Sequence, residues 1–139
     1  MKISIVDLIG HELSEIFPNI PVYKENQKGG FEEPSFFVEK ILTKVDPELF
    51  DVQMRTYNYQ LVYFPKLDEP NDDMEIVAEI LADNFTQLSD YAVIRNRVLK
   101  QSAGRTLLLT FSIQIRARRV DKTIKQQNMK FKGGIAYGR

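Results

Sequence analysis

The chain lacks cysteine entirely and has a single histidine, His11, so several kinds of chemistry are excluded at once. Without cysteine there are no disulfides and no thiolate metal ligands, and the composition is compatible with a reducing cytoplasm. A Cys-His nucleophile is excluded, and a Ser-His-Asp arrangement would have to be built around His11. Because His11 lies between Ile9 and Leu13 in an apolar helical pattern, we interpret it as a surface or boundary residue. We therefore expect no enzyme, no catalytic residue, no metal and no cofactor.

Long apolar runs are also absent. No stretch approaches the roughly 18 consecutive apolar residues of a membrane span, so we expect a soluble chain without membrane contact or a secretion signal. Lys28-Gly29-Gly30 lacks the second half of a phosphate-binding P-loop. Glu33 and Glu39-Lys40 are raw material for a metal-dependent nuclease, a third class of function, but their spacing is not distinctive. With 139 residues and 43% apolar side chains, the chain is expected to form one core.

Acidic and basic residues are present in equal number but are sorted along the chain. Residues 1–94 hold 18 of the 19 acidic and 7 of the 19 basic residues, a net charge of −11. Residues 95–139 hold the other 12 basic residues and only Asp121, a net charge of +11. The two blocks could attract each other between copies, in head-to-tail self-assembly, or could fold against each other within one monomer. The sequence favours neither alternative.

Two segments have the apolar spacing of helices. The first begins after Ser4, the expected N-cap, and should end at Pro18. Its stripe consists of Ile5, Ile9, Leu13, Ile16 and Phe17, with Val6 beside them. The second has Asn71 as its expected N-cap. Its stripe consists of Met74, Val77, Ala78, Leu81, Phe85 and Leu88. Residues 67–90 contain eight acidic residues and no Lys or Arg, so this helix should have a strongly negative solvent face.

Four segments are predicted to be strands. The clearest runs from Leu107 to Ala117, where apolar residues alternate strictly, and Tyr91 to Lys100 is its expected hairpin partner. Leu49 to Phe64 is the third, with a change of apolar parity that indicates a bulge or bend. Ser35 to Val45 is the fourth, joined to the third by a turn at Asp46-Pro47-Glu48.

The order helix, strand, strand, helix, strand, strand, with short connections, predicts an α+β fold. We expect a mainly antiparallel mixed sheet of four or five strands with two helices packed on one face. Residues 1–119 should form this single domain, and residues 120–139 a basic tail or arm whose apolar residues are too scattered for a core. The sheet must have edges, which are a liability in a monomer and a docking device in an oligomer.

Several short sequence segments resemble those of a known protein family. The segments Val22-Tyr23-Lys24-Glu25, Gln27 to Phe31, and Glu33 to Val38 resemble tail terminator proteins of phages and prophages of Gram-positive bacteria. Arg55, the strand end Val62 to Pro65 and the acidic helix after it continue the likeness to about Arg118.

The resemblance implies a small α/β subunit that assembles as a hexameric ring on the end of the tail tube. There it would stop tube growth and present a surface to the head-tail connector, and no catalytic residue is needed. The implied partners are a second copy of the chain, the tube protein and the connector protein, with room for DNA contact through the lumen. The implied location is the virion tail, after assembly in the bacterial cytoplasm.

The distribution of charged and apolar residues suggests candidate contacts for such a ring, in which a surface patch of one copy meets a different patch on the next copy. We expect the acidic helix to meet the basic strand and tail region, and the adjacent Phe36 and Phe37 to need a cover from a helix or another subunit. The candidate interface residues are Glu33, Phe36, Phe37, Asp72, Asp73, Glu79, Arg95, Arg97, Arg116, Arg118, Arg119, Lys122 and Lys125. The same basic residues keep an alternative open, a DNA-contacting head-tail joining or packaging accessory protein.

Overall fold

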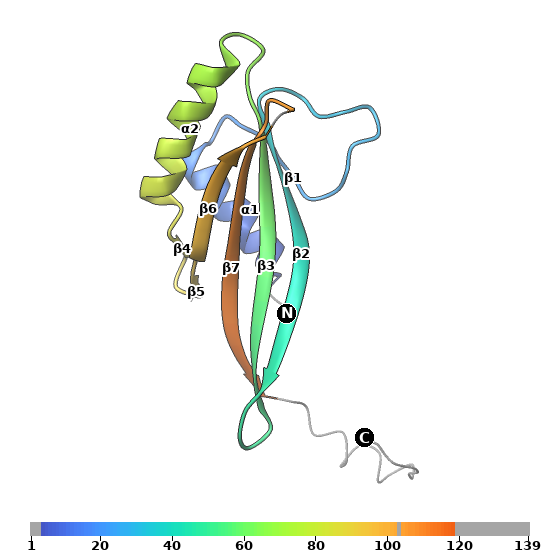
Figure 1. Cartoon of the computed structure of the whole chain (residues 1–139), viewed down its shortest axis with the longest axis vertical. Coiled ribbons are helices and arrows are strands. Elements are labelled where there is room, and N and C mark those ends of the chain that lie inside the picture. The colour runs from blue at the N-terminus through green and yellow to red at the C-terminus, as the bar shows by residue number, and fades with distance from the viewer. Residues whose placement is uncertain (1–3, 103, 119–139) are drawn as a thin grey trace.

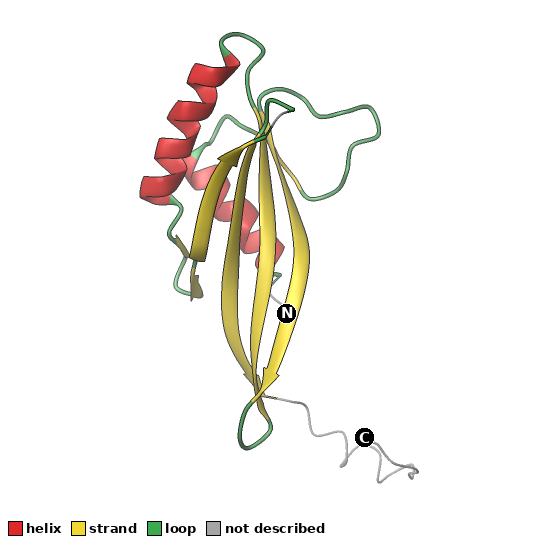
Figure 2. Ribbon diagram, in the orientation of Figure 1, coloured by secondary structure: helices red, strands yellow, loops and turns green. Residues whose placement is uncertain are grey.

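The computed structural model describes residues 4–102 and 104–118. It is a five-stranded mixed, mainly antiparallel sheet with two helices on one of its faces, which confirms the predicted α+β fold (Figures 1 and 2). The helices are α1 (Ile5–Ile16) and α2 (Pro70–Asn84). The sheet order is β1-β2-β3-β7-β6. Its strands are β1 (Val22–Tyr23), β2 (Ser35–Pro47), β3 (Val52–Phe64), β6 (Arg95–Gln101) and β7 (Leu107–Arg118). The strands β4 (Gln87–Leu88) and β5 (Ala92–Val93) pair separately.

Helix α1 forms as its spacing predicts. The Ser4 side chain caps it by accepting a hydrogen bond from the Asp7 backbone N–H. Ile9 and Leu13 are fully buried, and the helix ends at Phe17, where the chain turns before Pro18. The apolar stripe of α1 therefore packs on the sheet, and its polar side faces solvent.

Helix α2 begins differently from the prediction. Asn71 is not the N-cap, because Pro70 is already the first helical residue and Glu69 precedes it in the left-handed region, with no capping bond from its side chain. Proline is favoured at this first position, since its missing N–H has no partner there. Met74, Val77 and Leu81 are buried as predicted. Phe85 and Leu88 are buried too, but they lie beyond the helix, at its C-cap and in β4.

The core lies between the helices and the sheet face that carries the odd-numbered residues of β3 and β7. Tyr59, Leu61 and Tyr63 in β3 lie opposite Phe111, Leu109 and Leu107 in β7, and all of them are buried. The predicted period of two in the last strand is thereby confirmed. The neighbouring strand is shorter than predicted, because β6 begins only at Arg95 and residues 92–93 pair with β4 instead.

The connection between β2 and β3 corrects two predictions. Strand β2 continues through Asp46 to Pro47, so the expected turn at Asp46-Pro47-Glu48 is wrong, and the chain reverses at residues 49–51. Pro47 is tolerated because it ends an outer strand, where a missing N–H breaks no ladder. The predicted irregularity lies in β2, between Lys40 and Leu42, whereas the pairing of β3 with β7 is continuous.

The three long strands extend well past the helices, toward the bottom of Figure 1. We call this part the distal arm, defined as residues 42–58 with their hairpin turn and residues 113–118. Ile113, at its start, is the last buried residue of β7, and no residue from 42 to 58 is buried. The distal arm therefore has no core of its own and presents both faces of the sheet outward.

Candidate interaction surfaces

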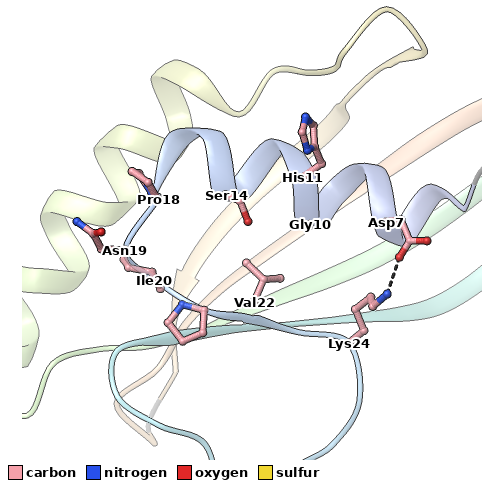
Figure 3. Close-up of a pocket in the computed structure, with 10 residues that line it drawn as sticks. Asp7, Gly10, His11, Ser14, Pro18, Asn19, Ile20, Val22 and Lys24 are labelled. Carbon is pink, nitrogen blue, oxygen red and sulfur yellow. Dashed lines mark hydrogen bonds and ion pairs between the residues drawn. The ribbon is translucent and has the colours of Figure 1, made fainter.

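The best-formed hollow lies between α1 and the segment leading into β1, with a volume of about 640 Å³. It is lined by Asp7, Gly10, His11, Ser14, Pro18, Asn19, Ile20, Pro21, Val22 and Lys24. An ion pair between Lys24 and Asp7 spans one side, and Figure 3 shows the imidazole of His11 on the side of the helix away from Val22. Among residues 4–102 and 104–118, no group of three or more His, Asp or Glu side chains could hold a metal ion.

The acidic surface lies on the helix layer. Asp72, Glu75, Glu79 and Asp83 are exposed along one side of α2, at spacings of three and four residues. In the middle of this row Ile76 is also exposed. Within the part of the chain that the structure describes, none of these four carboxylates forms an ion pair. Asp72 and Glu79, two predicted interface residues, therefore lie together on an accessible face.

Asp73 does not belong to this row. Its carboxylate Oδ2 accepts a hydrogen bond from the Tyr63 hydroxyl at 2.6 Å and another from the Lys66 backbone N–H at 3.0 Å. Burial, together with this bond and the charge of Asp73, raises the pKa of Tyr63 above its usual value. Asp73 thus joins the end of β3 to the start of α2, and its carboxylate is engaged within the subunit.

The paired phenylalanines point to opposite faces, as neighbours on a strand must. Phe36 is 0% exposed, with its ring 5.1 Å from that of Phe17 and 4.9 Å from that of Tyr63. Phe37 lies on the other face and is covered by Phe31, whose ring is 5.0 Å away and also stacks on Phe64 at 4.5 Å. The cover comes from the loop before β2, so neither a helix nor another subunit is needed for it. Glu33 is exposed in that loop.

The predicted basic residues separate into two places. Arg97 contacts the C-terminal end of α2, where its Nη1 donates to the carbonyls of Leu81, Ala82 and Phe85 at 3.0–3.2 Å. Arg116 and Arg118, at the end of β7, instead hold the hairpin turn of the distal arm. Arg95 is exposed at the start of β6. Arg119, Lys122 and Lys125 lie outside the described residues.

The tip of the distal arm is the surface that sequence reasoning missed. Arg116 Nε donates to Glu48 at 3.0 Å, and Arg118 donates to the Phe50 carbonyl at 3.4 Å. These contacts hold Leu49 and Phe50, whose side chains are 77% and 83% exposed. Two large apolar residues in a hairpin turn, where Asn and Gly are usual, are the signal that could have found this site.

The opposite charges of the chain are thus only partly neutralised within one subunit. Arg116 with Glu48 is the ion pair that joins the acidic and basic blocks among the described residues. The acidic row lies on α2, while Lys100, Arg116 and Arg118 lie on strands, in register with residues on the face opposite the helices. The acidic row of α2 and these three basic residues therefore lie on different sides of the molecule, whereas Glu39 and Asp46 are in register with the basic residues.

No described helix is of a length and apolarity that would let it cross the bilayer. None of the curated proteins matches the sequence. The family model described as phage tail terminator protein matches residues 4–127, which is most of the chain and includes every helix and strand described above. The chain therefore belongs to the phage tail terminator family.

Proposed function

We propose that the chain caps the end of the phage tail tube as a hexameric ring, stops tube polymerisation and provides the surface that joins the head. The observation that carries this proposal is the tip of the distal arm. Leu49 and Phe50 present exposed apolar side chains at one extreme end of the molecule, far from the core. A solvated turn has no use for two such residues, whereas a docking contact does.

The backbone of the tip supports the same interpretation. Phe50 and the next residue both have positive φ, at 61° and 62°, which is uncommon for a bulky side chain. The ring of Phe50 gains no burial in the subunit that would offset this conformation. Strained residues of this kind concentrate at functional sites, where a partner supplies the compensating contact. We assign that partner as the tail tube protein.

Ring assembly is supported by the separation of charge. Glu33, Asp72, Glu79, Arg95 and Arg118 are exposed, and copies related by a ring axis can bring such unlike patches together. Phe36, Asp73 and Arg97 are engaged inside the subunit, so we leave them out of the proposed contacts. Arg119, Lys122 and Lys125 stay predictions, as do a Gram-positive host and assembly in the bacterial cytoplasm.

The end of the molecule opposite the tip would then face the head-tail connector. Leu67, in the loop before α2, is 84% exposed at that end. A second candidate function, contact with DNA, is favoured by the exposed Lys100 and Arg118, on strands whose outer face carries no helix. In a ring this contact would occur in the lumen, so it complements the capping role.

A tube-length assay tests the proposal. Purified tube protein is polymerised with the chain added, and tube lengths are measured by electron microscopy. The Phe50→Asn variant removes the aromatic side chain, and asparagine tolerates the positive φ at this position. The variant should therefore fold normally and fail to limit tube length. Leu67→Ser is the matched control, because it removes an equally exposed apolar residue at the other end, and it should limit length like the natural chain.

Two results would contradict the proposal. One is that tubes grow to the same lengths with and without the natural chain. The other is that Phe50→Asn stops growth as efficiently as the natural chain, in which case the tip is not the tube contact.

A further inference from the structure

Both long edges of the distal arm lack a partner strand among the described residues. On one side, β1 pairs with β2 only at Phe36 and Phe37, so β2 is uncovered from Val38 to Pro47. On the other side, β6 pairs with β7 only as far as Ser112, so β7 has no hydrogen-bonded partner strand from Ile113 to Arg118, although β5 lies close to β7. The backbone N–H and C=O groups along these edges that point away from the sheet are a template for another strand.

The uncovered part of β2 is also apolar. Ile41 and Leu42, at the irregularity of the strand, are 55% and 58% exposed, and Val45 is exposed as well. A long edge strand with exposed apolar side chains invites pairing, and proteins that remain monomeric blunt such edges. The stretch also carries four charged residues, Glu39, Lys40, Lys44 and Asp46, of which Lys44 and Asp46 pair with each other at 3.6 Å.

We infer that the ring is closed by strand addition, with β7 of one copy pairing in parallel with β2 of the next. This inference rests on the ring proposed above. Strands β2 and β7 both run antiparallel to β3, so they point the same way. Copies related by a ring axis that runs along the arm therefore bring these two edges together in parallel. The edge of β2 already accepts a parallel strand, since β1 pairs with it in that sense.

The strands β1 and β6 conflict with edge pairing in the upper part of the sheet, and barrel geometry reduces this conflict. The upper part of the sheet is wider, because β1 and β6 flank it there. In a closed barrel the strands tilt by about 35–45°, so each copy is displaced along the strands relative to the last. For an arm of three strands this displacement is about four residues. It moves β1 of the next copy from the level of Leu107 and Leu108 to that of Phe111 and Ser112, where β6 begins at Arg95.

Charge favours the same pairing. Glu39 lies along the β2 edge and Arg118 along the β7 edge, in register with the same outer face of the sheet. Asp46 and Arg116 lie on the same edges and are also paired within the subunit, with Lys44 and Glu48. Copies joined edge to edge bring these unlike charges together. The helices would then cover the outside of the ring, with the acidic row of α2 away from the contact, so this inference replaces Asp72, Glu79 and Arg95 as contacts between copies by the two strand edges. The outer sheet face, with Lys100 and Arg118, would line the lumen.

Cysteine cross-linking tests the inference cleanly, because the chain has no cysteine of its own. The double variants Lys44→Cys/Gln114→Cys and Glu39→Cys/Gln114→Cys place one thiol on each edge, at exposed positions and in two registers. Within one subunit β3 separates the two edges, so the closer pair of Cα atoms is about 10 Å apart, too far for a disulfide. Oxidation with diamide can therefore join only different copies.

We expect the double variants, under conditions in which light scattering detects the ring, to give a ladder of oligomers that ends at the closed ring and collapses on reduction. The single variants should give dimers at most. A third pair, Glu79→Cys/Arg95→Cys, is the control for a contact between the acidic helix and β6, and it should give no ladder.

A ring that forms while neither edge pair cross-links overturns this inference and leaves the ring standing. If the chain stays monomeric with tube protein present and no pair cross-links, the ring itself is wrong. A ladder from Glu79→Cys/Arg95→Cys alone would assign the contact to the charged surfaces instead.

Discussion

Single side chains decide how the helix layer is fixed to the sheet. Tyr63 and Asp73 illustrate this, because their short hydrogen bond joins the end of β3 to the first turn of α2. We expect Tyr63→Phe to lower the free energy of unfolding by about 1–2 kcal/mol, since it leaves the half-buried carboxylate short of a donor. Urea unfolding measures the loss. The matched variant Asp72→Ala, at the exposed neighbour, should change stability much less, and an equal loss in both would refute this role.

Arg97 gives a second prediction at the residue scale. Its guanidinium satisfies carbonyls at the end of α2, where a positive charge also opposes the negative end of the helix dipole. Arg97→Ala should cost about 1–2 kcal/mol of stability. Arg97→Lys should recover part of it, since an ammonium keeps the positive charge and can donate to these carbonyls from one nitrogen as Nη1 does, but on a shorter side chain. Thermal unfolding of the two variants provides the test, and no loss in Arg97→Ala would show that the contact is not needed.

Buried tyrosines predict how stability responds to alkali. Burial, with smaller contributions from Tyr57 and Tyr91, raises the pKa of Tyr59 to about 12 from the usual 10. In the folded state Tyr59 keeps its proton at a pH where the unfolded chain has lost it. Stability should therefore be intact below about pH 10 and decline as the pH rises toward about 12. Urea midpoints at about pH 9 and pH 11 measure the decline, which Tyr59→Phe should reduce. An unchanged pH dependence in that variant would contradict the assignment.

At the scale of elements, the apolar periodicity of the sequence predicted those helices and strands that have one face buried in the core. The period of two in β7 and the stripe of α1 both reflect one face packed on the core, and both were recovered from the sequence. The start of α2 was not, because two local signals competed and Pro70 at the first position outweighed Asn71 as a cap. The interface residues fared unevenly for a similar reason. Asp73 and Arg97 have the right charge for a surface, but their partners come from other elements and are invisible in a linear pattern.

The distal arm was beyond sequence reasoning because it breaks the usual rules of a turn. Pro47 and the apolar pair Leu49-Phe50 gave no ordinary turn signal, so the hairpin was placed a few residues too early. The arm has little core, so packing within the subunit does not explain its exposed apolar side chains. The proposed contact with a partner does. The mismatch between local expectation and structure falls at the site where we propose function.

The exposed edge of β2 leads to a prediction about self-association. Replacing both Ile41 and Leu42 by Thr keeps β-propensity and removes exposed apolar surface. Because neither side chain belongs to the core, the thermal unfolding midpoint should change little, while sedimentation velocity should show weaker oligomerisation. The control is Ile76→Thr, which alters a similarly exposed side chain on α2, away from the arm. Equal oligomerisation in both variants would argue against the edge contact.

For the whole molecule, the central feature is that acidic and basic residues lie on different layers of the fold. The sorted charges of the sequence become an acidic row on the helix layer and basic residues on the sheet, with one ion pair between the two blocks among the described residues. Salt should therefore weaken the assembly, since exposed charges are screened over about 8–10 Å at moderate ionic strength. Hydrogen bonds between paired strands should preserve part of the assembly at high salt. Light scattering across a salt series should show partial rather than complete dissociation, and insensitivity to salt would remove charge from the account.

The most direct measurement is electron microscopy of tail tubes assembled with the natural chain in excess. Our account predicts tubes of limited length with a ring at one end, in which the tips of the distal arms point toward the tube. Tubes that keep growing with bare ends, or a ring whose arm tips point away from the tube, would contradict it.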